Sequence, residues 1–382
     1  MGKIFTSESV TAGHPDKLCD LIADKILDYY LEKDKKARVA VEVIAFNLHI
    51  HIFGQVTSSI KVENETFIKI AKDTLSETGY NKKEFGLTTD NVIVTVDLDS
   101  QSREISSGVD KGGAGDQGLM FGYASIETKD YMPLAISLAH RLSKELTRVR
   151  TENIIEGLGP DGKTQVTINT DDNDFPTSIH TVCVSTMHSE SKDLETLRKE
   201  ILKEVILPVC KDYLNDESII QINPVGSFTI GGPIADSGLT GRKNIVDSYG
   251  GYSRHGGGSY SGKDPSKVDR SASYMARYVA KNVVAAGLCD KIEIQVSYLI
   301  GISDPVGLSI ITFGTNHISD AKILEAIKKT FSFRPKDIIS SLELESPIYA
   351  KTTNYGHFGG EKDYLSWEKL DKVLELKKFL LN

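Results

Sequence analysis

Residues 15–57 read PDKLCDLIADKILDYYLEKDKKARVAVEVIAFNLHIHIFGQVT. Apolar side chains recur at helical spacing over residues 15–31, and Pro15 suits the first turn of a helix, so this part is predicted to form an amphipathic helix. Two β-rich runs follow, at 38–46 and 48–57, with only a short connector between them. The stretch therefore predicts a helix followed by two strands that pair in antiparallel fashion.

The same order of elements recurs along the chain. The first unit is completed by a predicted helix at 63–77 and a strand at 91–98. The second is predicted to contain helices at 132–149 and 193–211 and strands at 164–170, 177–187 and 219–222. The third is predicted to contain helices at 267–287 and 319–331 and strands at 291–301 and 307–314. We therefore expect an α+β protein of three similar α-β-β-α domains, with antiparallel or mixed sheets and helices on one face.

The composition is that of a globular protein. The chain has 382 residues, of which 40% are hydrophobic and 26% charged, and this length allows two or three domains. Its formal charge of −8 argues against binding of duplex nucleic acid, because a protein that binds a duplex needs a basic face. No apolar run approaches the roughly 18–20 residues of a membrane span, and no secretory core opens the chain. We expect a cytoplasmic protein without a membrane partner.

Glycine-rich segments at 108–118 and 226–262 separate the predicted units, and loops of this kind often carry function. Residues 113–118 satisfy G-x-G-x-x-G and residues 257–263 satisfy G-x-x-x-x-G-K. Neither motif follows a predicted buried strand, and Asp264 stands where a phosphate-binding loop needs Ser or Thr. A dinucleotide fold and a phosphoryl-transfer kinase are therefore weak interpretations.

Cationic side chains alternate with glycines between residues 242 and 270. They are Arg242, Lys243, Arg254, Lys263, Lys267 and Arg270. Backbone N–H groups exposed by glycine, together with a fan of cations, suit a polyphosphate ligand. A flexible loop whose charges face water is the alternative, and the glycines favour the functional interpretation.

The sequence GHPDK at 13–17 stands where the first helix is predicted to begin. It brings an imidazole, His14, and a carboxylate, Asp16, to a helix N-terminus, which is an anion and metal site in outline. An ordinary N-cap, with Asp16 favoured by the helix dipole, is the alternative. Asp269 offers a second oxygen ligand of the magnesium type, and Asp236 lies in a glycine-flanked loop.

Four stretches resemble the S-adenosylmethionine synthetase, or methionine adenosyltransferase, family. They are GHPDK at 13–17, GAGDQGLMFGYA at 113–124, INPVGSFTIGGPIADSGLTGRK at 222–243 and YGGYSRHGGGSYSGKDPSKVDRSASYMARYVAKN at 249–282. The resemblance extends over nearly the whole chain. It implies three similar domains about a pseudo-threefold axis, formation of S-adenosylmethionine from ATP and L-methionine, and release of phosphate and diphosphate. It also implies two Mg²⁺ ions per site, K⁺, and a homodimer or homotetramer with shared active sites.

The resemblance assigns roles by position. Catalytic roles fall on His14, Lys163, Arg242, Lys263 and Lys267. ATP contacts fall on His14, Asp161, Lys163, Ser227, Phe228, Asp236, Arg242, Lys243, Ser259 and Lys263. Methionine contacts fall on Gln55, Gln101, Asp236 and Lys267. Metal ligation falls on Asp16 and Asp269 for Mg²⁺ and on Glu42 for K⁺. Because a thioether sulfur needs no general base, catalysis would consist of alignment and stabilisation of the leaving triphosphate.

Three departures from the family pattern stand out. Gln55 replaces a glutamate expected to pair with the methionine ammonium, and an amide accepts a hydrogen bond but supplies no charge. Ser227 replaces an arginine common in bacterial members. The loop between Gln101 and Gly115 is several residues shorter, and a shorter lid can alter turnover.

The expected organisation is an N-terminal domain at 1–100, a mobile active-site loop at 101–113, a central domain at 114–226 and a C-terminal domain at 227–382. The alternative to an enzyme is a catalytically silent homologue that binds nucleotide or polyphosphate and acts in regulation.

Overall fold

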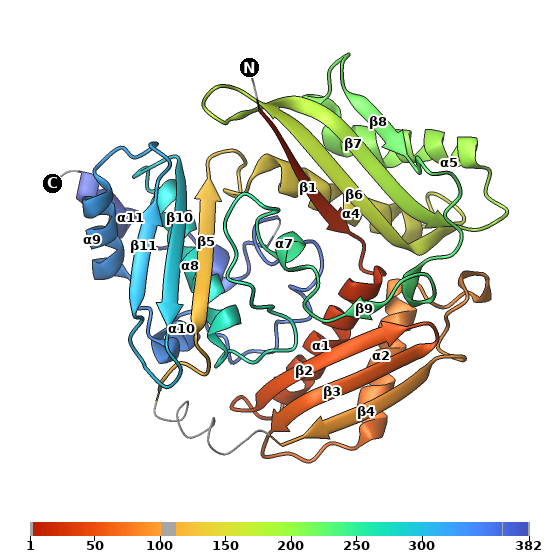
Figure 1. Ribbon diagram of the computed structural model, residues 1–382, viewed down its shortest axis with the longest axis horizontal. Coiled ribbons are helices and arrows are strands. Elements are labelled where there is room, and N and C mark those ends of the chain that lie inside the picture. Colours follow the sequence, from red (N-terminus) through yellow and green to blue (C-terminus); the bar gives the residue numbers. More distant parts are fainter. Residues whose placement is uncertain (1–2, 101–111, 361, 381–382) are drawn as a thin grey trace.

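The structure is a computed structural model that describes residues 3–100, 112–360 and 362–380. In these ranges the strands form three sheets, which lie around a common centre with helices packed behind them (Figure 1). The α+β class and the three similar units expected from the sequence are confirmed. The expected loop at 101–113 lies almost entirely outside the described residues.

The first unit follows the predicted order closely. Its elements are α1 (Pro15–Leu31), β2 (Arg38–Phe46), β3 (His49–Thr57), α2 (Asn64–Thr78) and β4 (Ile93–Asp99). β2 and β3 are antiparallel, as predicted, and β4 joins β3 in parallel. The apolar side chains of α1 enter the same buried core as the inward side chains of β2. The spacing that predicted this helix therefore also identified its buried face.

The second unit repeats this plan. Its elements are α4 (Leu134–Thr151), β6 (Leu158–Thr170), β7 (Pro176–His188), α5 (Leu194–Ile201), α6 (Leu207–Cys210) and β8 (Ile219–Ile222). The prediction of a helix over 193–211 is confirmed in its extent, because residues 194–210 are helical throughout, but a π-helical turn at Leu202–Ile206 joins α5 to α6. Pro208 follows that turn and has no N–H to donate, so a regular α-helix would lose a hydrogen bond there.

The third unit has the same helix–strand–strand–helix core. Its elements are α8 (Val268–Ala285), β10 (Lys291–Tyr298), β11 (Gly307–Ile311), α9 (Asp320–Thr330), α10 (Pro335–Ser341) and α11 (Val373–Lys377). Two short elements from the preceding loop, β9 (Gly238–Leu239) and α7 (Asn244–Asp247), lie between the units. β9 extends the first sheet by pairing with β2 at Ile44 and Ala45.

Besides the two-residue β9, two longer strands were not predicted, and each of these two joins a sheet whose other strands lie far away in the sequence. β1 (Ile4–Val10) pairs with β6, and β5 (Gly118–Ser125) pairs with β10. β1 directs Ser7 and Ser9 into the interior, so the apolar alternation that marks a strand is missing. In β5, a Cβ at Gly122 would lie 2.2 Å from the Ala276 carbonyl oxygen, so glycine permits the close approach of α8. Each of these two sheets is thus completed by a remote segment.

A buried histidine connects β1 to α4 and gives a pH-dependent prediction. The Nδ1 atom of His140 lies 2.8 Å from Ser9 Oγ, and burial, with Lys362 acting in the same direction, lowers the His140 pKa to about 3. The neutral ring therefore stabilises the fold above the ordinary pKa of about 6.5, and this stability is lost as the pH falls below it. Relative to His140→Gln, the wild-type free energy of unfolding should fall by about 2 kcal/mol between pH 6.5 and 4.5 in urea titrations. A pH-independent difference would contradict the assignment.

The apolar core has two parts. One is shared by the first and third units, and the other lies within the second unit between α4, α5 and the inner face of its sheet. Within the described residues, none of the helices combines the length and apolarity that crossing a membrane requires.

Candidate active site

The site is built on the N-terminus of α1, which follows β1 after a short turn. His14 caps the helix, because its Nδ1 accepts a hydrogen bond from the Asp16 N–H at 3.2 Å. The turn is held tightly, since Tyr80 donates its hydroxyl to the Gly13 carbonyl at 2.5 Å. A Cβ at Gly13 would lie 2.4 Å from the Pro160 carbonyl oxygen. The fold therefore fixes the imidazole at the start of the helix.

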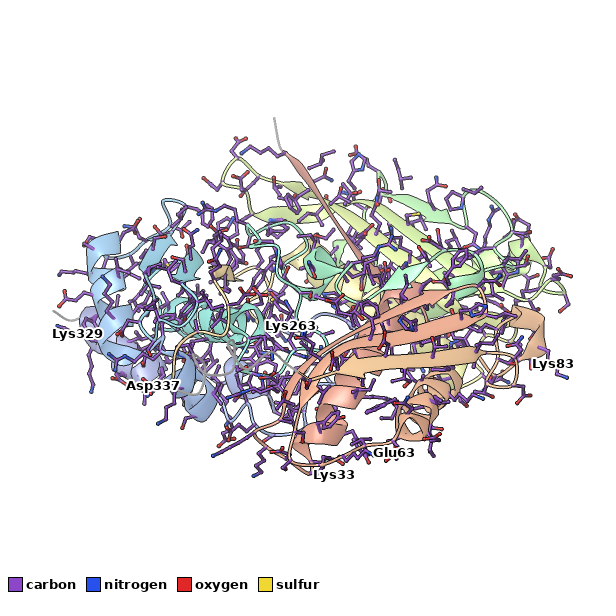
Figure 2. The ribbon with its side chains drawn as sticks, turned by 60° about the horizontal axis from the view of Figure 1, so that its bottom comes forward. Lys33, Glu63, Lys83, Lys263, Lys329 and Asp337 are labelled. Atoms are coloured by element: carbon purple, nitrogen blue, oxygen red, sulfur yellow. The ribbon has the colours of Figure 1, made fainter. Side chains whose placement is uncertain are left out.

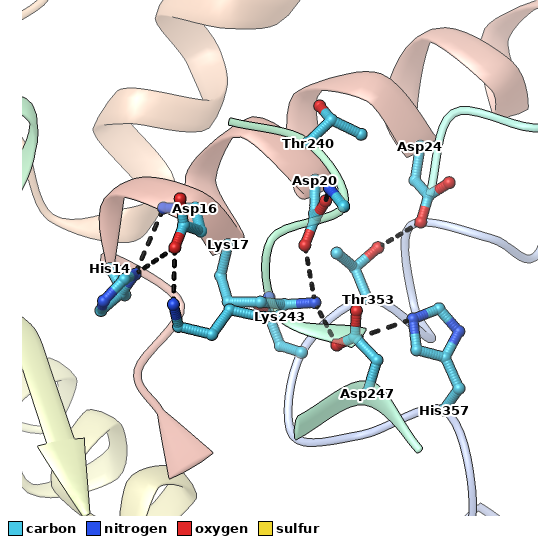
Figure 3. A network of polar contacts seen from close by, with 12 residues as sticks. His14, Asp16, Lys17, Asp20, Asp24, Thr240, Lys243, Asp247, Thr353 and His357 are labelled. Carbon is cyan, nitrogen blue, oxygen red and sulfur yellow. Dashed lines mark hydrogen bonds and ion pairs between the residues drawn. The ribbon is translucent and has the colours of Figure 1, made fainter. Parts of the chain in front are cut away.

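Asp16 contacts hydrogen-bond donors and cations from β9 and from the loop that follows it. Its side chain is 2% exposed, and Lys243 Nζ lies 2.6 Å from Oδ2 (Figure 3). Oδ1 accepts the Leu239 N–H at 3.0 Å and lies 3.6 Å from Arg242 Nη1. Burial, with Lys243 acting in the same direction, lowers the pKa of His14 to about 3. This end of the site therefore combines a neutral imidazole, a carboxylate and two cations.

A second group comes from the glycine-rich segment before α8. This segment runs beside β2, where Ala40 forms a bridge with Lys263 and the Val41 N–H donates to the Gly262 carbonyl at 3.0 Å. Lys263 Nζ lies 2.7 Å from Asp269 Oδ2. The lysine lies near the middle of the molecule, whereas Lys33, Lys83 and Lys329 project from its rim (Figure 2).

Asp264 explains why the near-match to a phosphate-binding loop is not one. Its carboxylate is fully buried, accepts the Val39 N–H at 2.7 Å and pairs with Lys267. The residue therefore anchors the segment to β2 instead of facing a ligand. Lys267, predicted at the methionine side, is held by this anchor.

Glycine contacts join the two groups into one site. Gly241 has φ +80°, and a Cβ there would lie 2.6 Å from Ser259 Cβ. The loop that carries Arg242 and Lys243 thus touches the loop that leads to Lys263. A Cβ at Gly258 would lie 2.2 Å from Asp269 Oδ1, so the second carboxylate is also packed against glycine backbone.

The predicted nucleotide-contacting residues of the second unit border the same helix end. Asp161 is buried and accepts the Gly232 N–H at 2.8 Å, and burial raises its pKa to about 6. A Cβ at Gly231 would touch both Phe228 and Asp161, at 3.0 and 3.2 Å. Asp236 lies exposed at the end of this turn.

Two further predicted residues of this region are at the surface. Lys163 is half-exposed and pairs with Glu8 at 3.0 Å, and its charge helps to lower the His14 pKa. Ser227 is exposed beside Phe228, whose N–H donates to His188 Nε2 at 3.1 Å.

For three predicted site residues, the structure describes no direct contact with the groups around His14, Asp16 and Asp269. Gln55 lies on β3 opposite Ala40, and Ala40 in turn is bridged to Lys263, so the three form one row across the sheet. Glu42 lies on the same open face of β2, opposite Phe53. Gln101 lies outside the described residues.

A row of aspartates on α1 was missed by sequence reasoning. Asp16, Asp20, Asp24 and Asp28 recur every four residues and lie along one side of the helix. Each accepts backbone N–H groups from later segments of the chain: Leu239 of β9, Gly241, Gly262, and Tyr349 with Ala350. Like charges at this spacing destabilise an isolated helix, so the repeat itself was a signal that partners lie opposite. The row attaches the cation-bearing loops to α1.

Asp16 and Asp269 are the carboxylates of this region that could hold Mg²⁺. Within the described ranges, no three His, Cys, Asp or Glu side chains are grouped as a metal site. Mg²⁺ does not need such a cage, because it commonly takes one or two carboxylates together with water and substrate phosphate. Asp16 and Asp269 fit that role, each now paired with a lysine. Glu42 belongs to no such group of three ligands in the described chain.

Cations gathered at a helix N-terminus, with carboxylates beside them, are typical of proteins that bind phosphate-containing ligands. Comparison with known families narrows this class. The S-adenosylmethionine synthetase N-terminal domain matches residues 2–103, the central domain matches 111–228 and the C-terminal domain matches 230–369.

Individual relatives agree over the full length. The chain is 50% identical over 379 residues to the S-adenosylmethionine synthase of Acholeplasma laidlawii, with 98% of each chain covered. It is 49% identical over 396 residues to that of Corynebacterium urealyticum, with 98% of each covered, and 48% identical over 396 residues to that of Finegoldia magna, with 100% of each covered. The chain belongs to the S-adenosylmethionine synthetase family and is a methionine adenosyltransferase. Nothing in these matches favours a silent homologue.

Proposed function

We propose that the chain forms S-adenosylmethionine from ATP and L-methionine, by attack of the methionine sulfur on C5′ of ATP, and then hydrolyses the triphosphate to phosphate and diphosphate. The observation that carries this proposal is the convergence of His14, Asp16, Arg242 and Lys243 at the N-terminus of α1. Family membership implies ATP and metal ions as reaction components in general.

The residues act chiefly on the leaving group. Breaking the C5′–O bond places negative charge on the triphosphate, and Arg242, Lys243 and Lys263 supply the positive charge that meets it. The neutral His14 ring would donate a hydrogen bond to that oxygen, at a helix end that itself favours anions. Lys163 adds a further cation from β6. No side chain needs to deprotonate the sulfur, which carries a free lone pair.

We propose Asp16 and Asp269 as the ligands of two Mg²⁺ ions. When bound, these ions would neutralise phosphate charge beside the cations. Lys243 and Lys263 would then leave their carboxylates and turn to phosphate oxygens, which suits flexible lysine side chains.

The remaining assignments are proposals on the same basis. ATP would also contact Asp161, Ser227, Phe228, Asp236 and Ser259, and methionine would contact Gln55, Gln101, Asp236 and Lys267. The row from Gln55 through Ala40 to Lys263 supports a methionine site beside the phosphate end. Gln55 can orient the amino group but adds no charge to hold it.

We also propose the domain organisation, the location and the oligomeric state of the protein. The proposed domains are residues 1–100, 114–226 and 227–382, with residues 101–113 as an active-site loop. The family resemblance supports a cytoplasmic homodimer or homotetramer with shared active sites, and K⁺ bound near Glu42.

A labelling experiment tests the activity. Purified protein is incubated with Mg²⁺, L-methionine and ATP labelled in the adenosine. We expect the label to appear in a sulfonium product, together with phosphate and diphosphate, and no product when methionine is omitted. Label that stays in ATP would support a silent binding homologue, and ADP formation without a sulfonium would support a kinase. Either result would overturn the proposal.

A further inference from the structure

Lys17 is a buried cation that the reaction outlined above does not use. It follows Asp16 on α1, its side chain is 1% exposed, and its Nζ lies 2.6 Å from Asp247 Oδ1 and 3.1 Å from Asp20 Oδ2 (Figure 3). A buried charge is stable only when it is paired, so removing either contact is costly. The ammonium therefore ties the Asp247 carboxylate to α1.

Asp247 ends α7, the single helical turn that directly follows Arg242 and Lys243. Its N–H donates to the Lys243 carbonyl at 2.8 Å, and its own carbonyl accepts the His357 N–H at 2.9 Å. One turn of helix is not stable by itself in water, so its position depends on such tertiary contacts. The contact between Lys17 and Asp247 thus fixes the backbone that carries both cations.

Two ion pairs of opposite polarity join α1 to this segment. In the outer pair, Asp16 of the helix holds Lys243 of the segment, and the Lys243 side chain remains 15% exposed to the site. In the inner pair, Lys17 of the helix holds Asp247, and both side chains are 1% exposed. Phosphate oxygens compete for the outer pair when substrate binds, whereas the inner pair is out of their reach. The inner pair can therefore keep the segment in place while the outer pair opens.

We propose that Lys17 is a positioning residue, which acts through Asp247 to hold Arg242 and Lys243 where they meet the triphosphate. The inference rests on the proposed function of this site. Lys17 touches no substrate; it contributes geometry, and a displacement of about 1 Å at reacting groups can cost about 10²-fold in rate.

The main test removes the link and leaves Lys17 paired with Asp20. Asp247→Ala should lower kcat by about 10²-fold. Asp247→Asn keeps the volume and an oxygen acceptor for Lys17, so it should fold even if the alanine variant does not, and its kcat should fall by about 10-fold. A folded Asp247→Ala with wild-type kcat would overturn the proposal, as would wild-type kcat in Asp247→Asn if only that variant folds.

Asp28→Ala is the matched control. Asp28 lies further along the same helix and also anchors a loop through backbone N–H groups, but that loop carries none of the proposed site residues. The control should lose stability without a change in kcat. If kcat falls equally in Asp28→Ala and Asp247→Ala, the effect is a general consequence of loosening α1, and positioning by Lys17 is refuted.

A binding measurement separates this inference from the proposed function. Calorimetric titration with inorganic triphosphate needs no turnover. We expect Asp247→Ala to bind it about 10-fold more weakly than Asp28→Ala, because its cations are misplaced. If the wild-type protein forms no sulfonium product, the proposed function fails, but the triphosphate affinities of Asp247→Ala and Asp28→Ala still test the positioning role of Lys17. Equal triphosphate affinities of the two variants, together with equal kcat values, would overturn that role.

Discussion

Asp24→Asn will lower the free energy of unfolding by about 3–5 kcal/mol, the cost of leaving a buried charge without its partner. Asp24 and Arg270 are both fully buried, with Nη1–Oδ1 and Nη2–Oδ2 distances of 2.6 and 3.0 Å. The carboxylate also accepts the Gly262 N–H at 2.9 Å and the Thr353 hydroxyl at 2.7 Å. An amide would meet these donors with one oxygen and a competing NH₂ group. Urea denaturation measures the loss.

Two comparisons make this result specific. The exposed pair of Asp304 and Arg334 has a similar two-bond geometry, and Asp304→Asn should lower the free energy of unfolding far less than Asp24→Asn does, because water screens the exposed pair. The double variant Asp24→Leu with Arg270→Met removes both charges and should recover most of the lost stability. A loss below about 1 kcal/mol in Asp24→Asn would contradict the account of a dry ion pair.

The loss of stability in Asp24→Asn depends on pH, because it requires the Asp24 carboxylate of the wild-type protein to be ionised. Although burial alone would raise the pKa of the carboxyl, Arg270 holds it below its ordinary value. A lowered pKa means that the stabilisation is present above the ordinary value of about 4 and is lost as the pH falls below it. Measurements near pH 7 therefore report the full difference.

His14→Asn will lower kcat for S-adenosylmethionine formation by about 10²–10³-fold, as expected for removal of a hydrogen bond aimed at developing charge. Asparagine is a good N-cap, and its Oδ1 can still accept the Asp16 N–H, so the start of α1 is preserved. The substitution therefore tests the imidazole itself. Steady-state kinetics with varied ATP separate the fall in kcat from any change in KM.

The matched control is His317→Asn, because His317 is exposed and pairs with Asp290 on the third unit. Its kcat should equal that of the wild-type protein. Unchanged kcat in His14→Asn would show that the imidazole does not contact the leaving group, and the mechanism would need another donor.

The sequence predicts the repeated units well where apolar spacing is strong. The helix at 15–31 and the strand at 38–46 were placed at their observed bounds because one face of each enters the core. β1 was missed because serine side chains occupy its inward positions. The helix between Leu194 and Cys210 was predicted, but its π-helical turn was not, because residue spacing alone does not show how a proline is accommodated.

The sequence predicted which residue types make up the site, but not which of these residues contact one another. Glycine-flanked cations and the GHPDK turn pointed to a polyphosphate site, because those residue types suit that ligand wherever they lie. The pairings of Asp16 with Lys243 and of Lys17 with Asp247 could not be predicted, since they depend on how distant loops dock on α1. The four-residue spacing of aspartates was the visible sign of that docking.

The pairing of β1 with β6 has a consequence for the order in which the protein folds as it is synthesised. Val10 pairs with Lys163, and the turn that carries His14 follows Val10 at once. Because the ribosome delivers the chain from its N-terminus, β1 has no partner until β6 has emerged. β1 is therefore made well before the strand with which it pairs, and such long-range pairing slows folding. A truncated nascent chain that ends before β6 will lack an ordered His14 turn.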